Sequence, residues 1–558
     1  MNHPTPAIVS QREVQRLPRW ALIMLCAAYI LPGLVGRDPW RNSDLITFGF
    51  INALANEQTS WLSPELMGIS AQGGLLPYWI GAVFVKALPF LDAPVAARLP
   101  FLLTLIAVFT LTWFACYYFA RTDSAQPIAF AFGGEAHPND YARAIADGAL
   151  LALMASLGLL QTGHETSPEL IQLGFITLFL FGFAIAPFKR WPAWLSIVIS
   201  LPALALSDAP FMALMLGVIG FIMCINSEYE KARSCGLAFL LSIALVCALM
   251  TFAPIWTDIH IQIKAPGQTL KVFLKNAVWF MWPVWFFMLW ALWQWRYLWR
   301  RRHISAPLVV LVLCFVASIA NGVEKSYLLF ALPCMAILAA FALPTLKRSL
   351  SALVDWFALC LFTLLMICSW VYWYALLSGH PAKQAAQVLR LIPGFEPKFE
   401  WIPFILASLA TIAWLWLVRW RTGRHSPAIW KSMVLSAGGV TLCWFIPMTL
   451  GLSGIDYARS FRPWTEKIIR VVEVNGRPEC LSTLELNTTQ IAAWSWQPGI
   501  PLRPESDNCP YLIVNAPTYY FIPQVDGQRW VLDPNGIIVR PNDRTREDCV
   551  LIYKRREN

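Results

Sequence analysis

The sequence is short of charged residues. Only 14% of its 558 residues are Asp, Glu, Lys or Arg, and 57% are hydrophobic, whereas soluble domains carry roughly 25% charged residues. This balance excludes an ordinary soluble protein and predicts a membrane protein. Because the bilayer core offers no water to backbone groups, we expect the apolar stretches to form helices.

Phosphate-binding and metal-binding motifs are also missing. The chain contains no Walker-type loop, no dinucleotide fingerprint, no G-x-S-x-G elbow and no closely spaced zinc-ligand set. Nucleotide-driven chemistry is therefore unsupported. The net charge of +10 comes from short Lys and Arg clusters between apolar runs, a pattern that indicates membrane orientation rather than nucleic-acid binding.

The apolar runs predict about thirteen crossings between Trp20 and Leu452. A crossing needs about 18 or more apolar residues, and residues 20–35 fit a signal anchor. The short Gly74–Phe90 stretch fits a juxtamembrane helix, and with that choice the basic clusters fall on the cytoplasmic side, as the positive-inside rule expects. Residues 1–19 are then cytoplasmic, 20–453 form the membrane module, and 36–95 form its first periplasmic loop.

The C-terminal segment, residues 454–558, changes in character. It carries charges, prolines and short alternating apolar runs, which predict a small α/β or β-rich domain. After an odd number of crossings it lies outside, where Cys480 and Cys509 can form a disulfide. Cys549 is left over, and spacing alone does not fix the pairing.

Two acidic residues stand out in the first external loop. Asp38 and Asp44 lie in the run Gly-Arg-Asp-Pro-Trp-Arg-Asn-Ser-Asp at 36–44, just before a helical stretch. An acid at this place beside a membrane is a candidate base or ligand. The alternative is that both residues are helix caps or turn residues, which aspartate favours.

The second external loop packs ionisable residues between two apolar spans. His164, Glu165 and Glu169 lie within six residues of one another. Acids at the membrane edge are costly unless they face water or a partner, so a functional role is the first hypothesis. The alternative is that Ser167-Pro168-Glu169 simply begins a helix, with proline and an acid in its first turn.

A lysine begins a late span in the third loop. Lys325 could hold a lipid phosphate as a compact point charge, or its amine could extend to lipid headgroups. Glu324 and Tyr327 flank it as further pocket candidates. His260, in the long loop at 256–276, is more typical of a surface group than of a metal ligand.

Three pieces of sequence carry a resemblance to a known family. They are Pro-Trp-Arg-Asn-Ser-Asp at 39–44 with Trp-Leu-Ser-Pro at 61–64, Tyr-Trp at 78–79 with Ala-Ala-Arg-Leu-Pro at 96–100, and Lys-Ser-Tyr-Leu-Leu-Phe-Ala-Leu-Pro at 325–333. With these motifs the chain resembles bacterial GT-C glycosyltransferases. Within them it is similar to the group containing aminoarabinose transferase and protein O-mannosyltransferase-like enzymes.

The resemblance implies an all-α polytopic membrane helix bundle with a small external C-terminal domain. It also implies inverting sugar transfer from a polyprenyl phosphate donor, such as undecaprenyl phosphate, to a lipid, glycan or protein acceptor. The reaction would face the periplasm from the bacterial inner membrane. No cofactor is assigned, and a divalent metal is left open.

Roles transfer to single residues under this resemblance. Asp44 becomes the general base on the acceptor hydroxyl, and Glu165 or Glu169 corresponds to the acid of the second loop. Lys325, helped by Arg37 or Arg98, stabilises charge on the leaving phosphate.

The chain also departs from the family pattern. Ser43-Asp44 stands where the family has an Asp-Glu pair, so Asp38 remains a rival base. Ala-Gln-Gly-Gly at 71–74 replaces a Glu-Lys-Pro motif, so a phosphate or metal role there does not transfer.

Two other functions stay open. A transporter or lipid flippase would show inverted repeats and ionisable residues near span centres, whereas these acids gather at one face. A non-catalytic envelope assembly subunit would share the architecture without sugar transfer.

The Lys325 assignment makes a prediction. If its amine binds the donor phosphate, Lys325→Ala raises KM for the donor lipid more than KM for the acceptor, because only the donor carries the phosphate. Steady-state kinetics with each substrate varied in turn measures this. An unchanged donor dependence would show that the lysine only contacts headgroups.

Overall fold

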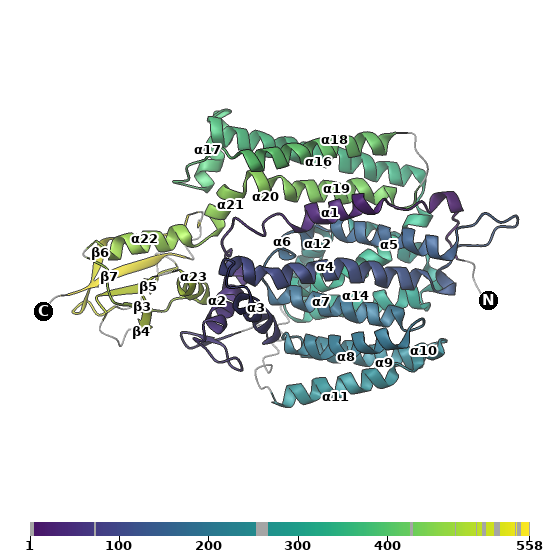
Figure 1. Cartoon of the computed structure of the whole chain (residues 1–558), viewed down its shortest axis with the longest axis horizontal. Coiled ribbons are helices and arrows are strands. Elements are labelled where there is room, and N and C mark those ends of the chain that lie inside the picture. Colours follow the sequence, from purple (N-terminus) through teal and green to yellow (C-terminus); the bar gives the residue numbers. More distant parts are fainter. Residues whose placement is uncertain are drawn as a thin grey trace.

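The computed structural model describes residues 5–71, 74–252, 266–423, 428–474, 476–497, 499–504, 509–517, 525–541, 543 and 548–556. Most helices lie side by side in a bundle, and a small sheet extends from one end of it (Figure 1). We call this the sheet end of the bundle. It also carries the short helices α2 (Ser43–Ala55) and α3 (Leu76–Ala87).

Each of the thirteen predicted crossings has its centre inside a helix. These helices are α1 (Arg19–Ile30), α4 (Ala93–Ala120), α5 (Pro138–Ala155), α7 (Pro168–Ile185), α8 (Arg190–Leu206), α9 (Pro210–Ile225), α11 (Gly236–Phe252), α13 (Val284–Gln294), α14 (Arg302–Ala320), α15 (Lys325–Ala340), α16 (Arg348–Ser378), α18 (Trp401–Thr422) and α19 (Lys431–Phe445). The remaining helices are α6 (Leu157–Thr162), α10 (Glu230–Arg233), α12 (Pro266–Phe280), α17 (Ala382–Leu391), α20 (Pro447–Leu450), α21 (Leu452–Arg459), α22 (Arg462–Val472), α23 (Thr488–Trp496), and the 3₁₀ turns η1 (Gln11–Glu13), η2 (Asp123–Ala125), η4 (Arg296–Leu298) and η5 (Leu343–Thr345).

Within the described ranges, eight helices are long and apolar enough to cross a membrane. Nine qualify if α12 and α13, which meet at 101°, count as one broken span. The number is below thirteen because α1, α8 and α9 have 12, 17 and 16 residues, and α5 carries charged residues. The fold is a polytopic helix bundle, and the chain is a multi-pass membrane protein.

The stretch interpreted as juxtamembrane forms the 12-residue helix α3. It packs against α2 and α4. Gly74 has φ +80°, and a Cβ on it would lie 2.5 Å from the backbone nitrogen of Asp208. Only glycine fits there without strain, so the chain before α3 can touch the turn between α8 and α9, where Leu75 N donates to Leu206 O at 2.9 Å.

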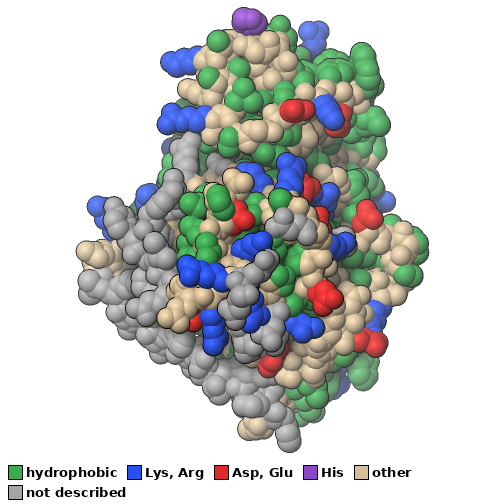
Figure 2. All heavy atoms as spheres, turned by 90° about the vertical axis from the view of Figure 1, so that its left-hand side faces the viewer, with side chains coloured by type: hydrophobic (Ala, Val, Ile, Leu, Met, Phe, Trp, Pro, Cys, Tyr) green, Lys and Arg blue, Asp and Glu red, His purple; other side chains and the backbone are tan. Residues whose placement is uncertain are grey.

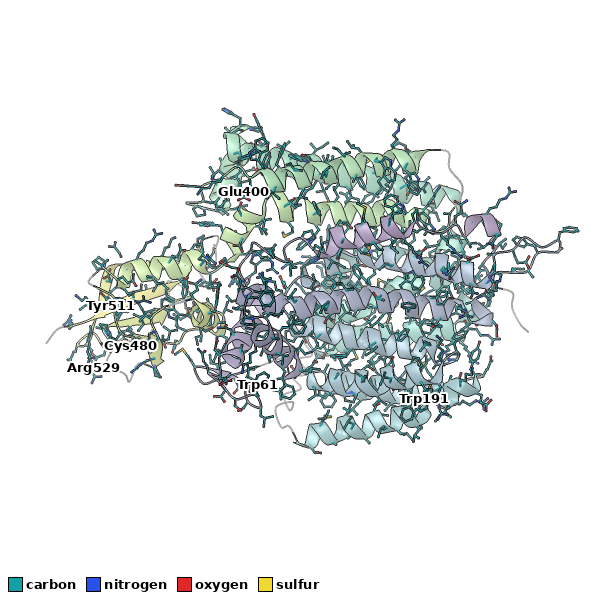
Figure 3. All side chains as sticks on the ribbon, in the orientation of Figure 1. Trp61, Trp191, Glu400, Cys480, Tyr511 and Arg529 are labelled. Atoms are coloured by element: carbon teal, nitrogen blue, oxygen red, sulfur yellow. A yellow bond between two sulfur atoms is a disulfide. The ribbon has the colours of Figure 1, made fainter. Side chains whose placement is uncertain are left out.

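Several predicted cytoplasmic loops meet at the end opposite the sheet. Arg301 pairs with Glu228 at 3.1 Å, and Lys231 Nζ donates to the Phe188 carbonyl at 3.4 Å. Aromatic residues mark both ends: Trp61 lies at the sheet end and the exposed Trp191 at the other (Figure 3). Tryptophans at such depths are typical of membrane interfaces.

The C-terminal region has mixed α/β structure. Its five-stranded sheet has the order β4-β3-β5-β7-β6, with β4, β3 and β5 parallel and the β5–β7 and β7–β6 pairs antiparallel. Cys480 and Cys509 form a disulfide. The strands are β3 (Leu481–Leu484), β4 (Leu502–Pro504), β5 (Tyr511–Asn515), β6 (Trp530–Ile538) and β7 (Val550–Arg555), and a separate hairpin of β1 (Glu65–Leu66) and β2 (Ile69–Ser70) lies in the first loop.

Ion pairs fasten this region to the first loop. The Asp38 carboxylate accepts from Arg462 Nε at 2.9 Å and Nη2 at 2.5 Å, and Arg41 pairs with Asp548 at 3.1 Å. Figure 2 shows basic and acidic side chains intermixed over the middle of this face. We call these contacts between the first loop and the C-terminal region the seam. The seam holds the loop that leads into α2, where Asp44 lies.

Candidate functional site

Asp44 is at the centre of the site and is completely buried. Its Oδ2 accepts from Arg37 Nη1 at 2.7 Å and from the Trp40 amide at 2.9 Å, and its Oδ1 accepts from the Thr166 amide at 2.8 Å. The helix α2 thus begins with an acid that joins two loops far apart in sequence. Asp44 lies in the first turn of α2, close to the helix-cap role given as the alternative for it.

The neighbours of Asp44 stabilise its ionised form. Burial opposes ionisation, but Arg37, Arg98 and the two amide hydrogen bonds together lower the pKa of the Asp44 carboxyl. Arg37 Nη1 and the Trp40 and Thr166 amides all donate to the Asp44 carboxylate. The side chain is 0% exposed to solvent. In this conformation Asp44 is ionised and already saturated, so an acceptor hydroxyl has no access to it.

Arg37 completes this core by bonding in several directions. Its Nε donates to the Gly33 carbonyl at 2.7 Å and its Nη2 to the His164 carbonyl at 2.7 Å. The guanidinium lies 4.3 Å from the centre of the Trp40 ring. Arg37 therefore acts as a structural cation between the first and second loops, with no donor left facing a cavity.

Glu165 lies next to this pair and has the opposite electrostatics. Its Oε1 accepts from Gln161 Nε2 at 2.6 Å. Burial, with a further contribution from the Asp44 charge, raises the pKa of Glu165 to about 7, against the effects of Gln161, Arg37 and Arg459. A carboxyl near neutrality can both take and give a proton at physiological pH.

His164 is a structural residue of the second loop. Its Nδ1 and Nε2 lie 2.7 Å from the carbonyl oxygens of Leu160 and Tyr29. The ring also packs on Trp444, with 4.4 Å between ring centroids. It therefore holds the loop against α1 and α19.

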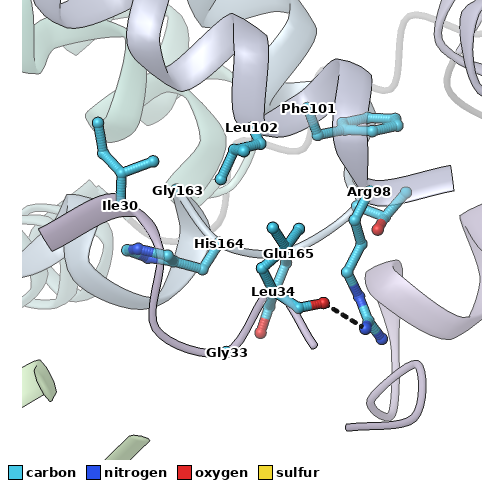
Figure 4. Close-up of a pocket in the computed structure, with 10 residues that line it drawn as sticks. Ile30, Gly33, Leu34, Arg98, Phe101, Leu102, Gly163, His164 and Glu165 are labelled. Atoms are coloured by element: carbon cyan, nitrogen blue, oxygen red, sulfur yellow. Dashed lines mark hydrogen bonds between the residues drawn. The ribbon is translucent and has the colours of Figure 1, made fainter. Parts of the chain in front are cut away.

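Arg98 faces a narrow cavity of about 20 Å³ that Glu165 and His164 also line. Its side chain is 4% exposed, and Nη1 donates to the carbonyls of Arg37 at 2.9 Å and Leu34 at 3.2 Å (Figure 4). Its Nε and Nη2 have no partner among the described residues. A cavity of this size has room for about one water molecule, so as shaped here it does not hold a phosphate.

A much larger groove opens on the other side of Gln161. It has a volume of about 680 Å³ and an almost entirely apolar wall from α16, α17, α19, α20 and α21. Its polar lining includes Gln161, Trp40 and Arg459. Arg459 Nη2 donates to Gln161 Oε1 at 3.4 Å, and its guanidinium lies 4.8 Å from the Trp40 ring centre.

The other predicted residues occupy different places. Glu169 follows Pro168 in the first turn of α7, as the helix-start alternative expected, and lies 3.4 Å from Ser43 Oγ. Asp38, the rival base, is engaged by Arg462 and Ser460. Both acids thus have structural partners.

Lys325 is exposed at the start of α15, and no ion pair or hydrogen bond joins it to Asp44 or Glu165 in the described part of the chain. Glu324 accepts from Ser326 Oγ at 2.8 Å, and Tyr327 packs on Phe330. His260 lies outside the described residues. Where side chains are described, no group of three His, Cys, Asp or Glu residues could hold a metal ion.

The sequence interpretation missed Arg459 and Gln161. A signal for Arg459 was present: it follows the last span on the side where short loops are almost free of lysine and arginine. A basic residue that departs from the positive-inside pattern needs another reason to be there. Gln161 carried no such signal, since a polar residue at a span end is ordinary.

Comparison with solved structures identifies the fold. ArnT from Cupriavidus metallidurans bound to undecaprenyl phosphate aligns with a TM-score of 0.61 at 13% identity, over 96% of this chain and 98% of that one. Its apo form gives 0.60 at 12% identity, over 96% and 97%. This chain has the ArnT fold. The archaeal oligosaccharyltransferase AglB from Archaeoglobus fulgidus aligns at only 0.29, over 76% of this chain and 56% of that one.

The ArnT fold extends over the C-terminal sheet as well as the helix bundle, because the alignment covers nearly all of both chains. It agrees with the GT-C architecture expected from the sequence motifs. No family model and no curated protein sequence matches the chain.

Substituting each of the two central acids should separate their roles. Asp44→Asn leaves Arg37 buried without its counter-charge, so we expect a loss of about 3 kcal/mol of stability. Glu165→Gln should not destabilise the fold. Because the folded state raises the pKa of Glu165 from 4.5 to about 7, stability falls as pH rises between these two values and the full cost is present at pH 8; glutamine removes that cost. Thermal unfolding at pH 8 measures both, and a lower Tm for Glu165→Gln would contradict this assignment.

Proposed function

We propose that this protein is a membrane glycosyltransferase that moves a sugar from a polyprenyl phosphate carrier to an acceptor hydroxyl. The acceptor is a lipid, a glycan or a protein. The reaction takes place at the sheet end, on the periplasmic side of the inner membrane. The observation that carries the proposal is the placement of Gln161 and Arg459 at the polar rim of an apolar groove of about 680 Å³, with Glu165 hydrogen-bonded to Gln161 behind that rim.

The groove suits a lipid phosphate. Its apolar wall lies beside the helix bundle, where a prenyl chain can leave water, and Arg459 stands at its polar rim to receive the head group. Arginine pairs with phosphate through short charge-assisted hydrogen bonds. In support, the ArnT of the matched structure is bound to undecaprenyl phosphate.

The chemistry needs one base and one cation. Glu165 takes the proton of the acceptor hydroxyl as its oxygen attacks the anomeric carbon from the face opposite the phosphate. The bond from that carbon to the phosphate oxygen breaks, and its electron pair stays on the phosphate, so the sugar inverts. Arg459 stabilises the charge that develops on the leaving group.

Asp44 has a positioning role in this proposal. It holds Arg37 and the Thr166 amide, and through them the loop that presents Glu165. This revises the base assignment carried over from the family resemblance. We expect Asp44→Asn to abolish transfer by loosening the loop rather than by removing the base.

The donor site can be tested with purified protein in nanodiscs. We expect radiolabelled sugar transfer from an undecaprenyl phosphate donor, with KM for the donor raised about 10- to 100-fold by Arg459→Ala. A hydrogen bond to a charged group contributes about 1.5–3 kcal/mol, and 1.4 kcal/mol is tenfold. Arg390→Ala, at an exposed site on α17, is the matched control. No transfer to any lipid, glycan or protein fraction would refute the function.

The pH dependence identifies the base. A base must be deprotonated, so kcat/KM should rise as pH passes about 7, the pKa of Glu165. If Asp44 were the base, its lowered pKa would leave the profile level from about pH 5 upwards. A level profile between pH 5 and 8 would therefore return the role to Asp44.

A further inference from the structure

The Gln161 side chain connects Arg459, at the rim of the groove, to Glu165. Gln161 lies in the last turn of α6 and lines the groove. Its amide nitrogen donates to Glu165 at 2.6 Å, and its amide oxygen accepts from Arg459 at 3.4 Å. Donor and acceptor of one neutral amide thus face groups of opposite charge.

In this row of hydrogen bonds, Arg459 is bound only weakly by its neighbours. Among the described residues its guanidinium has one hydrogen bond, a long one to Gln161, and it lies 4.8 Å from the centre of the Trp40 ring. A phosphate oxygen forms charge-assisted bonds of about 2.7–2.9 Å with arginine. A lipid phosphate in the groove would therefore outcompete the neutral amide for Arg459.

The surroundings of Glu165 make it sensitive to this exchange. Arg37 and Arg459 favour its ionised form, and Asp44 opposes it. Arg98 and His164 line the narrow cavity on its other side. Arg37 is fixed by Asp44, so Arg459 is the cation whose effect a ligand in the groove can cancel.

Gln161 should strengthen that effect. In a chain of hydrogen bonds each bond polarises the next, so Arg459 bonded to the amide oxygen makes the amide N–H a better donor to Glu165. When Arg459 turns to a phosphate, this support weakens and the Glu165 carboxylate holds a proton more firmly. Glu165 then becomes a stronger base only when the lipid is present.

We propose that Gln161 is a positioning residue through which a lipid phosphate bound in the groove prepares Glu165 for proton transfer. This inference rests on the proposed function. It adds that donor binding and base strength are coupled, so that the ionised Glu165 carboxylate attracts the acceptor proton more strongly when a donor is in place.

The experiment compares two pH profiles in nanodiscs. The profile of kcat/KM for the donor reports the free enzyme, and that of kcat reports the complex. In the wild-type protein we expect the apparent pKa from kcat to lie about one pH unit above that from kcat/KM, as removal of one nearby positive charge implies. In Gln161→Met, which has similar length and no amide, this difference between the two apparent pKa values, called the gap below, should fall to less than half of its wild-type size.

Controls make the outcome decisive. Gln528→Met, at an exposed turn before β6, should keep the full gap. Gln161 is itself exposed, so its variants should fold, which the thermal transition checks. If Gln161→Met fails to fold, Gln161→Asn, whose shorter side chain cannot reach both partners, replaces it. Transfer with no gap in the wild type, or with an unchanged gap in the Gln161 variant, overturns the inference and leaves the function standing.

A second measurement does not depend on turnover. Undecaprenyl phosphate, added without sugar to the wild-type protein at pH 7, should increase the infrared carbonyl band of a protonated carboxyl. Glu165→Gln should abolish that increase and Gln161→Met should reduce it. An unchanged band in wild type overturns the coupling even if no acceptor is found.

Discussion

The rest of the site depends on the buried ion pair between Arg37 and Asp44. Two opposite charges taken out of water are costly unless each finds further hydrogen bonds, and here both do. Asp44 collects the Trp40 and Thr166 amides, and Arg37 collects the Gly33 and His164 carbonyls. Satisfying these charges forces the first and second loops into one arrangement, which places Glu165 beside Gln161.

Environment then separates the two acids. Asp44 has a cation and two amides bonded to it, so it stays ionised and occupied. Burial, with a further contribution from the Asp44 charge, raises the pKa of the Glu165 carboxyl to about 7. Two carboxyls with their pKa values pushed apart in this way are a recurring device for dividing structural and proton-transfer roles.

The seam with the C-terminal region supplies the remaining cation. Asp38 engages Arg462, and Arg540 Nη1 donates to the Ala458 carbonyl at 2.7 Å. These contacts fix the end of α21 and the turn before α22, and Arg459 is the last residue of α21. The C-terminal region is thus part of the site's architecture, because its contacts help to set where Arg459 stands relative to the groove.

The sequence alone determined what depends on local composition. The apolar runs predicted the helices, since crossing a bilayer requires length and low polarity in one continuous stretch. The motifs at 39–44 and 325–333 indicated the architecture that the ArnT alignment shows. The C-terminal change in composition predicted the α/β region.

Only the tertiary structure decided which polar groups meet. Asp38 and Arg462 are separated by 424 residues, and Arg459 and Gln161 by 298, so no local pattern reports that they touch. The same holds for base strength: Asp44 and Glu165 are both acids next to apolar helices, and their different proton affinities arise from burial and from partners that folding brings from elsewhere in the chain. A pKa is set by burial and neighbouring charge, and both are properties of the folded molecule.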